Sequence, residues 1–360
     1  MRDPFKEYKE TLREEELRYM RAALDEAEKG VGHTRPNPPV GAVIVKSGRI
    51  IGRGYHARCG EDHAEVAALK SCIMTPKDAT AYVTLEPCST AGRVGACTDA
   101  LMSAGIKRVE WLVADPNPKN HNLAARNFKF YGIRTRYWAS RMYSGYRGLY
   151  ERGYNLIRPF AKVIKTGLPF VTVKLAMSMD GKICDNLGNA KWISDEEARK
   201  VTLNMRDKVD CVLVGAETIR RDNPSLLLHT DINHQDENPD LYRAVITRSG
   251  NLPKNAQIFT DIAKERTIVL NISDTFTLRD ALKSLAARGL QNILCEGGLN
   301  LARSLAAAGL VDRWMTVLCP IVIGDKPLDQ ALRYTELDEL EQESIRSTDE
   351  ILVADTFKEF

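Results

Sequence analysis

The feature that most constrains the fold of this chain is an alternation of short apolar runs, rich in β-branched residues, with segments whose apolar residues recur at helical spacing. In the N-terminal half the predicted strands lie at 40–45, 50–55, 81–85 and 109–114, and the predicted helices at 17–27, 63–71 and 98–104. A second series of apolar runs begins at Phe170 and reaches Cys295. Strands that alternate with helices pack in layers around a sheet, so the sequence predicts an α/β fold in each half.

The length of 360 residues and the break between the two series predict two domains. We place the first domain at 1–150 and the second at 169–360. Residues 151–168 between them form a basic linker, because the stretch from Arg134 to Lys165 has eight basic residues, a single Glu151 and no clear strand pattern. We interpret its charge as that of a solvated connector, which can contain a helix, and an RNA-binding strip is the alternative.

The composition limits the classes of partner and the compartment. Lys and Arg number 51 against 48 Asp and Glu, which leaves a net charge of +3, too balanced to indicate a polyanion partner. We expect no nucleic-acid or membrane partner, since aromatic residues make up only 7% and no apolar run approaches the ~18 residues of a membrane span. The first 19 residues lack the apolar core of a secretion signal, so we expect a cytoplasmic protein whose eight cysteines are metal ligands, reactive thiols or buried apolar groups.

One histidine and two cysteines in the first half have the spacing of a catalytic zinc site. His63 begins a predicted helix, Cys88 follows a predicted strand, and Cys97 lies nine positions further on. One imidazole and two thiolates make three zinc ligands and leave a fourth position open, which is typical of catalytic rather than structural zinc. Glu65, two residues after the histidine, can accept a proton from water and pass it to a leaving amine. The order His-x-Glu, Pro-Cys, Cys is the signature of zinc-dependent base deaminases, with a longer gap between the cysteines than usual.

The segments around these residues occur in a specific order: Thr34–Val45, Gly54–His56, His63–Leu69, Thr84–Ser89, Gly92–Arg93, Cys97 and Asp115–Pro118. This order, with eight residues between the cysteines, resembles the deaminase domain of the RibD family of bifunctional riboflavin biosynthesis enzymes. The resemblance implies a cytidine-deaminase-like α/β/α domain that binds zinc through His63, Cys88 and Cys97 and moves protons with Glu65. It also implies contacts to the pyrimidine and its ribose phosphate from Asn37, His56, Arg93, Asp115 and Asn117.

Parts of the first half depart from the pattern of that family. Thr90 occupies a position that is commonly histidine, and Val94-Gly95-Ala96 replaces a common Thr-Pro-Pro. Lys119–Ala125 replaces a stretch that is usually rich in glycine. The zinc set is intact, so these departures concern the fit of the substrate.

A further set of motifs follows in the second half: 169–174, 178–182, 192–194, Arg206, 214–215, Thr218, 222–224, 296–298 and 310–312. They resemble the reductase domain of the same family, which is similar in fold to dihydrofolate reductase and uses NADPH. The resemblance implies that NADPH contacts Trp192, Thr218, Asp222, Gly297 and Gly298. It implies that the substrate contacts Lys174, Arg206, Leu226, His229 and Glu296.

The residues themselves also indicate a phosphate site in this half. Asn292–Cys295 has the pattern of a strand, Glu296-Gly297-Gly298 that of a tight turn, and Leu299–Ala308 that of a helix. Glycines let the backbone approach a phosphate, and the N-terminus of a helix offers N–H groups to it. A plain strand-to-helix turn is the alternative, since the sequence has no Gly-x-Gly-x-x-Gly fingerprint.

These patterns together predict a bifunctional enzyme. The resemblance implies that it deaminates a diaminopyrimidinone ribosylamino phosphate with zinc and then reduces the ribosyl group to ribityl with NADPH. Its expected partner is therefore a small phosphorylated pyrimidine, and we also expect a homo-oligomer. An alternative is a deaminase whose reductase domain is degenerate or retuned to a related pyrimidine, because Ala190 and His229 replace a serine and an arginine of the family pattern. A third hypothesis, an RNA-binding and base-modifying protein, is disfavoured by the balanced charge.

Overall fold

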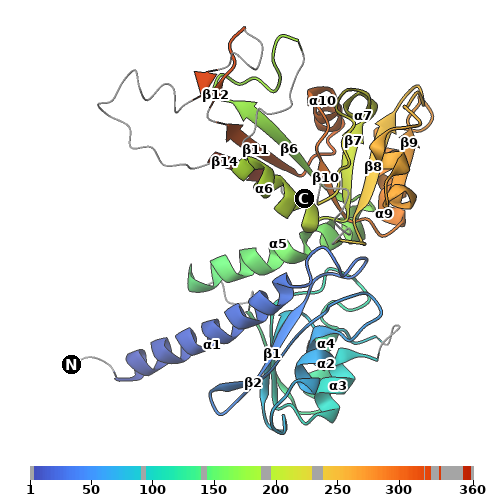
Figure 1. The fold of residues 1–360 in the computed structure, drawn as a ribbon. Coiled ribbons are helices and arrows are strands. Elements are labelled where there is room, and N and C mark those ends of the chain that lie inside the picture. The colour runs from blue at the N-terminus through green and yellow to red at the C-terminus, as the bar shows by residue number, and fades with distance from the viewer. Residues whose placement is uncertain are drawn as a thin grey trace, which may run out of the picture. The chain divides into compact units, whose positions relative to one another are not determined.

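The structure is a computed structural model that describes residues 4–90, 95–138, 144–187, 196–228, 238–319, 321–325, 332–333 and 352–357. The chain divides into two compact units, Met1–Gly167 and Leu168–Phe360 (Figure 1). Each unit is a mixed α/β structure, as the sequence predicted. Among the residues described, none of the helices combines the length and the apolar character that crossing a membrane requires.

The first unit is a five-stranded sheet between two layers of helices. Its strands, in the order β2-β1-β3-β4-β5 across the sheet, are β2 Arg49–Tyr55, β1 Gly41–Lys46, β3 Thr80–Leu85, β4 Arg108–Val113 and β5 Arg134–Tyr137. Strand β1 runs antiparallel to β2 and β3, whereas β3, β4 and β5 are parallel. Its helices are α1 Pro4–Glu28, α2 Ala64–Lys70, α3 Cys97–Ser103, α4 Leu123–Phe130 and α5 Ser144–Thr166. This α/β/α arrangement confirms the predicted fold class.

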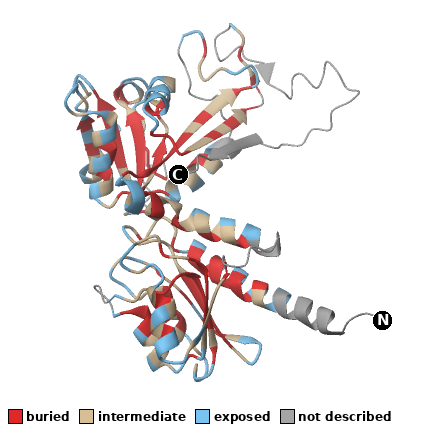
Figure 2. Ribbon diagram, turned by 180° about the vertical axis from the view of Figure 1, so that it is seen from behind, coloured by how far each residue is buried: buried red, intermediate tan, exposed pale blue. Residues whose placement is uncertain are grey.

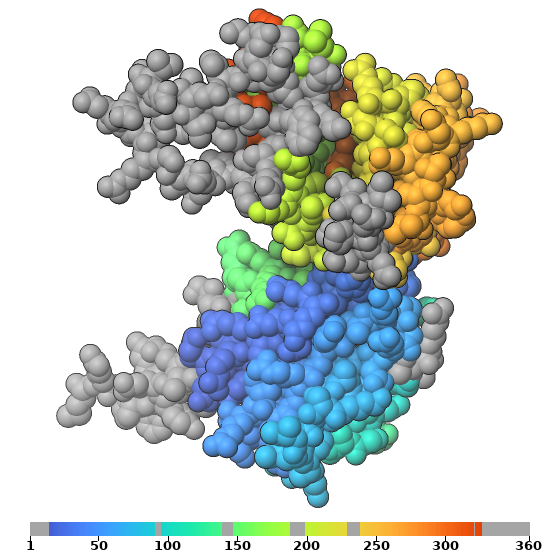
Figure 3. All heavy atoms as spheres, in the orientation of Figure 1, coloured from blue at the N-terminus to red at the C-terminus, as the bar shows by residue number. Residues whose placement is uncertain are grey.

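Strand β1 shows how the sequence builds the two helical layers. Val43 and Val45 pack in the cluster that contains α1 and α5 residues, whereas Ala42 and Ile44 pack in the cluster that contains α2, α3 and α4 residues. Gly41 permits the close approach of α1, since a Cβ there would lie 2.1 Å from the Ala23 carbonyl oxygen. The N-terminal part of this unit, coloured blue, forms most of the face towards the viewer in the space-filling view (Figure 3).

Residues 134–137 form the edge strand β5, so the expectation of no strand from Arg134 onward is wrong. The cause is a fully buried carboxylate on the neighbouring strand β4. Glu110 accepts hydrogen bonds from Arg136 Nε (2.9 Å), Arg136 Nη2 (2.6 Å) and Trp138 Nε1 (2.7 Å). The basic residue Arg136, which contributed to the prediction of a solvated connector, is therefore paired with a buried acid within the first unit.

Residues 151–168, the expected linker, lie largely within helix α5, which contacts α1 and β4 of the first unit. Arg152 of this helix pairs with Asp25 (2.8 Å) and Glu28 (2.7 Å) on α1. The first compact unit accordingly extends to Gly167. The structure thus differs from the sequence-based boundaries by including this segment in the first unit.

The second unit contains a seven-stranded sheet in the order β14-β11-β6-β10-β7-β8-β9. These strands are β14 Leu352–Phe357, β11 Arg313–Cys319, β6 Phe170–Ser178, β10 Asn292–Cys295, β7 Cys211–Gly215, β8 Tyr242–Thr247 and β9 Thr267–Asn271, and a two-stranded ribbon joins β12 Ile321–Val322 to β13 Leu332–Arg333. The helices are α6 Glu196–Asp207, α7 Ala216–Asp222, α8 Gln257–Thr260, α9 Leu278–Ala287 and α10 Leu299–Ala307, with a short 3-10 turn at Lys264–Arg266.

All pairs of this seven-stranded sheet are parallel except the antiparallel pair of β11 with the edge strand β14. Two clusters of buried residues cover its two faces, one with α9 and α10 and the other with α7 and α8. Figure 2 shows the buried residues gathered in the strands of both units. In parallel sheets ligands bind at the carboxyl ends of the strands. In this sheet β6, β10 and β7 are the central strands, so we expect the ligand site at their carboxyl ends.

Candidate active sites

The three predicted zinc ligands lie together at one end of the first sheet. His63 precedes α2, Cys88 follows β3, and Cys97 begins α3. The Nδ1 atom of His63 lies 3.1 Å from Cys97 Sγ and 3.6 Å from Cys88 Sγ, and the two sulfur atoms are 3.2 Å apart. All three ligand atoms lie within 4.8 Å of one another. One imidazole and two thiols at these distances fit a zinc ion with an open fourth position.

The two thiols differ in their tendency to ionise. Cys88 accepts hydrogen bonds from the Cys97 thiol and backbone N–H, and with His63 these lower the pKa of Cys88 to about 4. The hydrogen bond to Cys88 and burial raise the pKa of Cys97. This shift favours the thiolate form of Cys88, which is the form that binds zinc.

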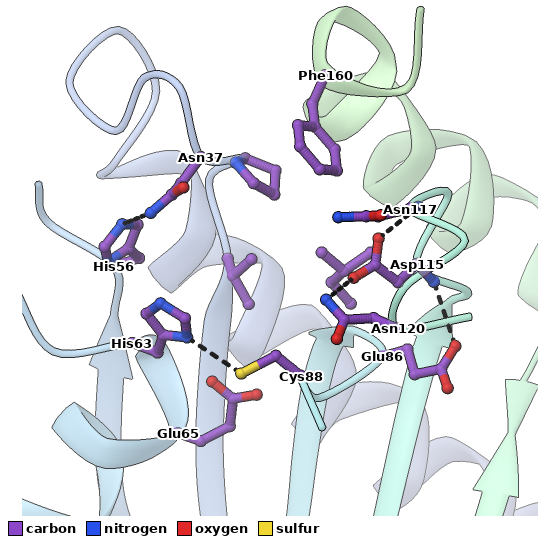
Figure 4. A pocket seen from close by; sticks show the side chains of 13 residues that line it. Asn37, His56, His63, Glu65, Glu86, Cys88, Asp115, Asn117, Asn120 and Phe160 are labelled. Carbon is purple, nitrogen blue, oxygen red and sulfur yellow. Dashed lines mark hydrogen bonds between the residues drawn. The ribbon is translucent and has the colours of Figure 1, made fainter. Parts of the chain in front are cut away.

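Glu65 lies beside the thiolate on the first turn of α2. Its side chain points toward Cys88 in Figure 4 and is only 3% exposed. Burial, and then the charge of Cys88, raise the pKa of Glu65 to about 7. A carboxyl group with this pKa can both accept and release a proton near neutral pH.

Four of the five predicted substrate residues of the first unit line a cavity of about 180 Å³ that is also lined by His63, Glu65 and Cys88 (Figure 4): Asn37, His56, Asp115 and Asn117. On one wall, Asn37 Nδ2 lies 3.0 Å from His56 Nε2, and His56 Nδ1 lies 3.0 Å from the Asp62 carbonyl oxygen. Burial lowers the pKa of His56, which favours the neutral ring. Because a carbonyl only accepts, Nδ1 carries the proton and Nε2 accepts from the Asn37 amide. These bonds fix the orientation of the amide.

The opposite wall of the cavity consists of Asp115 and Asn117, which follow β4, and of residues that sequence analysis did not assign. The unassigned polar residues are Glu86 and Asn120, and Phe160 contributes an aromatic ring from α5. Glu86 adjoins Pro87-Cys88 in the motif already singled out, which was a usable signal. No sequence signal pointed to Phe160, because this residue lies in the segment that was expected to be a linker. Arg93 lies outside the described residues.

Glu86 fastens the loop that carries this wall. Its carboxylate, buried at 2% exposure, accepts from the backbone N–H groups of Asp115 (3.3 Å), Asn122 (3.1 Å) and Ala124 (3.3 Å). Asn122 is the N-cap of α4, has φ 60° and provides no side-chain cap. The carboxylate of Glu86, the residue directly after β3, therefore caps α4 and holds both ends of the 115–122 loop.

The second unit brings together the predicted residues Lys174, Arg206, Leu226 and Glu296. Arg206 Nε and Nη2 donate to the two Glu296 oxygens at 2.7 and 2.9 Å, and Nη1 donates to the Leu227 carbonyl at 2.7 Å. Burial opposes ionisation of Glu296, but Arg206 outweighs it and the pKa of Glu296 is lowered. Burial lowers the pKa of Lys174. The charge of Glu296 acts to raise this pKa, and the charge of Arg206 acts to lower it.

Leu226 lies beside this pair in a left-handed backbone conformation with φ 59°, which is uncommon for a leucine. The Arg206 bond to the next carbonyl, at Leu227, helps hold that conformation. His229 lies outside the described residues, as do Ala190 and Trp192.

The glycine turn lies where the second sheet would hold a nucleotide. Gly298 is the N-cap of α10, and nothing lies within 4 Å of where its Cβ would be. A Cβ on Gly297 would lie 2.7 Å from Leu301 and 3.4 Å from the backbone nitrogen of Gly215. The β10–α10 turn therefore packs closely against the start of α7, which carries Thr218 and Asp222. Open backbone at the start of a nine-residue helix suits the phosphates of NADPH.

Comparison with known families assigns both halves. Residues 13–113 match the cytidine and deoxycytidylate deaminase zinc-binding region, and residues 169–353 match the RibD C-terminal domain. The riboflavin biosynthesis protein RibD of Aquifex aeolicus is 32% identical over 331 residues, which cover 87% of this chain and 89% of that protein. The RibD protein of Bacillus amyloliquefaciens is 34% identical over 327 residues, 85% of each chain.

Solved structures give the same assignment for the fold over most of the chain. Acinetobacter baumannii RibD superposes with a TM-score of 0.76 at 30% identity, covering 86% of this chain and 88% of that chain. A Thermotoga maritima diaminohydroxyphosphoribosylaminopyrimidine deaminase/5-amino-6-(5-phosphoribosylamino)uracil reductase has the same TM-score and coverage at 32% identity. With both domains matched in order across nearly the whole length, the chain belongs to the RibD family of riboflavin biosynthesis proteins.

Proposed function

We propose that this chain is a bifunctional enzyme of riboflavin biosynthesis that uses zinc and NADPH. Its first unit hydrolytically deaminates a diaminopyrimidinone ribosylamino phosphate, and its second unit reduces the ribosyl group of the product to ribityl. One observation supports this proposal above all: a single chain of this family contains both sites. The first unit has the His63, Cys88 and Cys97 cluster beside Glu65. The second unit has the Arg206–Glu296 pair at the end of its sheet.

In the first unit, the residues of the cavity divide the work of hydrolysis. A zinc ion held by His63, Cys88 and Cys97 would activate water as the nucleophile. Glu65 accepts a proton from water on a carboxylate oxygen as the water oxygen bonds to the ring carbon, and it delivers that proton to the amine. The C–N bond then breaks and ammonia departs, and the remaining hydroxyl proton moves to the ring nitrogen so that a carbonyl is left. Asn37 and Asp115, on opposite walls, hold the pyrimidine so that the reacting carbon faces Glu65.

In the second unit, the residues bind and orient the two reactants. NADPH supplies the hydride. The α10 N-terminus at Gly298 holds its phosphates, and Thr218 and Asp222 contact the dinucleotide from α7. Lys174 and Arg206 place positive charge where the phosphorylated substrate binds, and Glu296 keeps the Arg206 fork in position.

The intact Arg206–Glu296 pair, with Lys174 beside it, favours an active reductase over the degenerate or retuned one. The departures that motivated that alternative, Ala190 and His229, lie outside the described residues. A small-molecule partner is also favoured over RNA, since Arg152 of the basic segment is paired with acidic residues of α1. We further propose a homo-oligomer, which light scattering of the purified chain would test.

A product analysis tests both activities at once. The purified chain is incubated with the diaminopyrimidinone phosphate, with and without NADPH, and the products are followed by mass spectrometry. We expect the deaminated compound without NADPH, and the deaminated and reduced compound with it. Deamination alone under both conditions would refute the reductase assignment, and an unchanged substrate would refute the whole proposal.

A further inference from the structure

Asn120 bridges two parts of the pocket in the first unit. Its Oδ1 accepts from the Thr90 hydroxyl (2.9 Å) and from the Ser89 backbone N–H (3.4 Å), on the segment that follows Cys88. Its Nδ2 donates to Asp115 Oδ2 at 3.0 Å. In Figure 4 the Asn120 side chain lies between Cys88 and Asp115. One amide therefore connects the segment after a zinc-site cysteine to the substrate-facing carboxylate.

The bridge sets the orientation of the Asp115 carboxylate. Asp115 Oδ1 accepts from the Asn117 backbone N–H at 2.8 Å, while Oδ2 accepts from Asn120. An ionised carboxylate has about four acceptor sites, so two hydrogen bonds leave acceptors for N–H or O–H donors of a ligand. With both oxygens held, those remaining acceptors keep a fixed direction in the cavity.

The Asn120 side chain is not needed to form the loop itself. Glu86 already holds the loop at Asp115 and at Asn122, and the Asn120 backbone N–H donates to the Asn117 carbonyl at 2.9 Å. Changing this side chain should therefore leave the loop folded, while it releases the carboxylate.

Two partners in the bridge lie far apart in the sequence. Thr90 lies two residues after Cys88, and Asn120 lies in the loop after β4. Their side chains contact each other directly, although 30 positions separate them. The bridge therefore needs both side chains, and a change in either one alters it.

We propose that Asn120, together with Thr90, is a positioning element of the deaminase pocket that determines how Asp115 receives the hydrogen-bond donors of the pyrimidine substrate. The inference rests on the proposed deaminase function. It assigns no proton transfer to Asn120, which acts on the substrate only through Asp115.

Two isosteric variants separate the two sides of the bridge. Asn120→Asp keeps an acceptor for Thr90 but places an oxygen against Asp115, whereas Thr90→Val removes the hydroxyl and leaves the Asp115 bond in place. We expect Asn120→Asp to raise the deaminase KM about tenfold or more, the scale of losing a hydrogen bond to a charged group, with a smaller change in kcat. Thr90→Val should give a smaller rise, and Thr90→Ser should restore the parent KM.

Three controls distinguish positioning from a general loss of structure. Asn127→Asp on α4 makes the same change of charge away from the cavity and should leave KM unchanged. Zinc content and the reduction of deaminated substrate by the same chain should match the parent in every variant. The double variant of Thr90→Val and Asn120→Asp should raise KM less than the product of the two single effects, because both act through one bridge.

The outcomes separate this inference from the proposed function. A parent chain that does not deaminate the diaminopyrimidinone phosphate would overturn both. An active parent with an unchanged KM in Asn120→Asp would overturn the positioning role alone. So would a KM rise in that variant accompanied by an equal loss of zinc, because the change would then act on the metal site.

Discussion

The buried Arg206–Glu296 pair offers the sharpest test of how the second unit is built. Arg206→Met keeps the length of the side chain but removes both bonds to Glu296 and the bond to the Leu227 carbonyl. The carboxylate then remains buried without its main partner. Breaking such a pair on one side costs about 3–5 kcal/mol. For a unit of this size each kcal/mol lowers the Tm by about 2–4 °C, so we expect a decrease of roughly 6–20 °C.

The assay is differential scanning calorimetry of the full chain, with deaminase activity as a measure of the intact first unit. Arg206→Lys keeps the charge but lacks the planar fork, and should give an intermediate Tm. Replacing both partners, as Arg206→Met with Glu296→Leu, should recover most of the loss, since apolar pairs replace buried ion pairs at little cost. A Tm of Arg206→Met equal to that of the parent would refute the reasoning.

The same pair gives a pH dependence with a defined sign. The pKa of Glu296 in the folded chain lies below its ordinary value of about 4.3. Its contribution to stability is therefore present above pH ~4.3 and is lost as the pH falls through the folded pKa. The difference in Tm between the parent and Arg206→Met should be constant near neutral pH and should narrow in acid.

Three further predictions concern the two sites. Cys88→Ala should lose the zinc that the parent retains through dialysis. If metal analysis finds the same zinc content in the variant and the parent, Cys88 is not a zinc ligand. Glu65→Gln should keep zinc but lose deamination by ~100-fold or more while reduction of deaminated substrate continues, and an active variant would contradict its role in proton transfer. Because burial lowers the pKa of Lys174, its charge is lost at lower pH than in an ordinary lysine, so the reductase KM should rise in the alkaline range, and Lys174→Arg should abolish that rise.

The sites that sequence reasoning found are those whose chemistry restricts the residue types. Zinc sites draw their ligands from a few residue types, and hydrolysis needs a nearby acid, so His63, Glu65, Cys88 and Cys97 were visible from residue type and spacing. The structure places the three ligand side chains together, and Glu65 lines the same cavity as His63 and Cys88. The strands that bring them together were visible for a similar reason, since Ala42–Val45 is a run of apolar residues buried on both faces of the sheet.

Strand β5 shows why a charged segment was misread. Arg136 pairs with Glu110, which lies 26 positions away and is itself fully buried. Periodicity and composition describe neighbours along the chain, and neither contains information on which distant partner a charge will meet. The surplus of basic residues in this segment was real, but the fold surrounds part of it with acids of β4 and α1.

The position of Phe160 in the pocket could not be predicted either, because it depends on which face of α5 packs against the sheet. Gly153, Ile157 and Phe160 are spaced four and three residues apart and so share one face of the helix. A Cβ on Gly153 would lie 2.7 Å from Leu112 of β4, and Ile157 is buried in the same cluster as Leu112. That face therefore follows β4 toward its carboxyl end, where Asp115 begins the pocket wall, and the next residue on the face, Phe160, reaches the cavity. The segment that composition alone marks as a connector thus closes the first active site because of its helical register against β4.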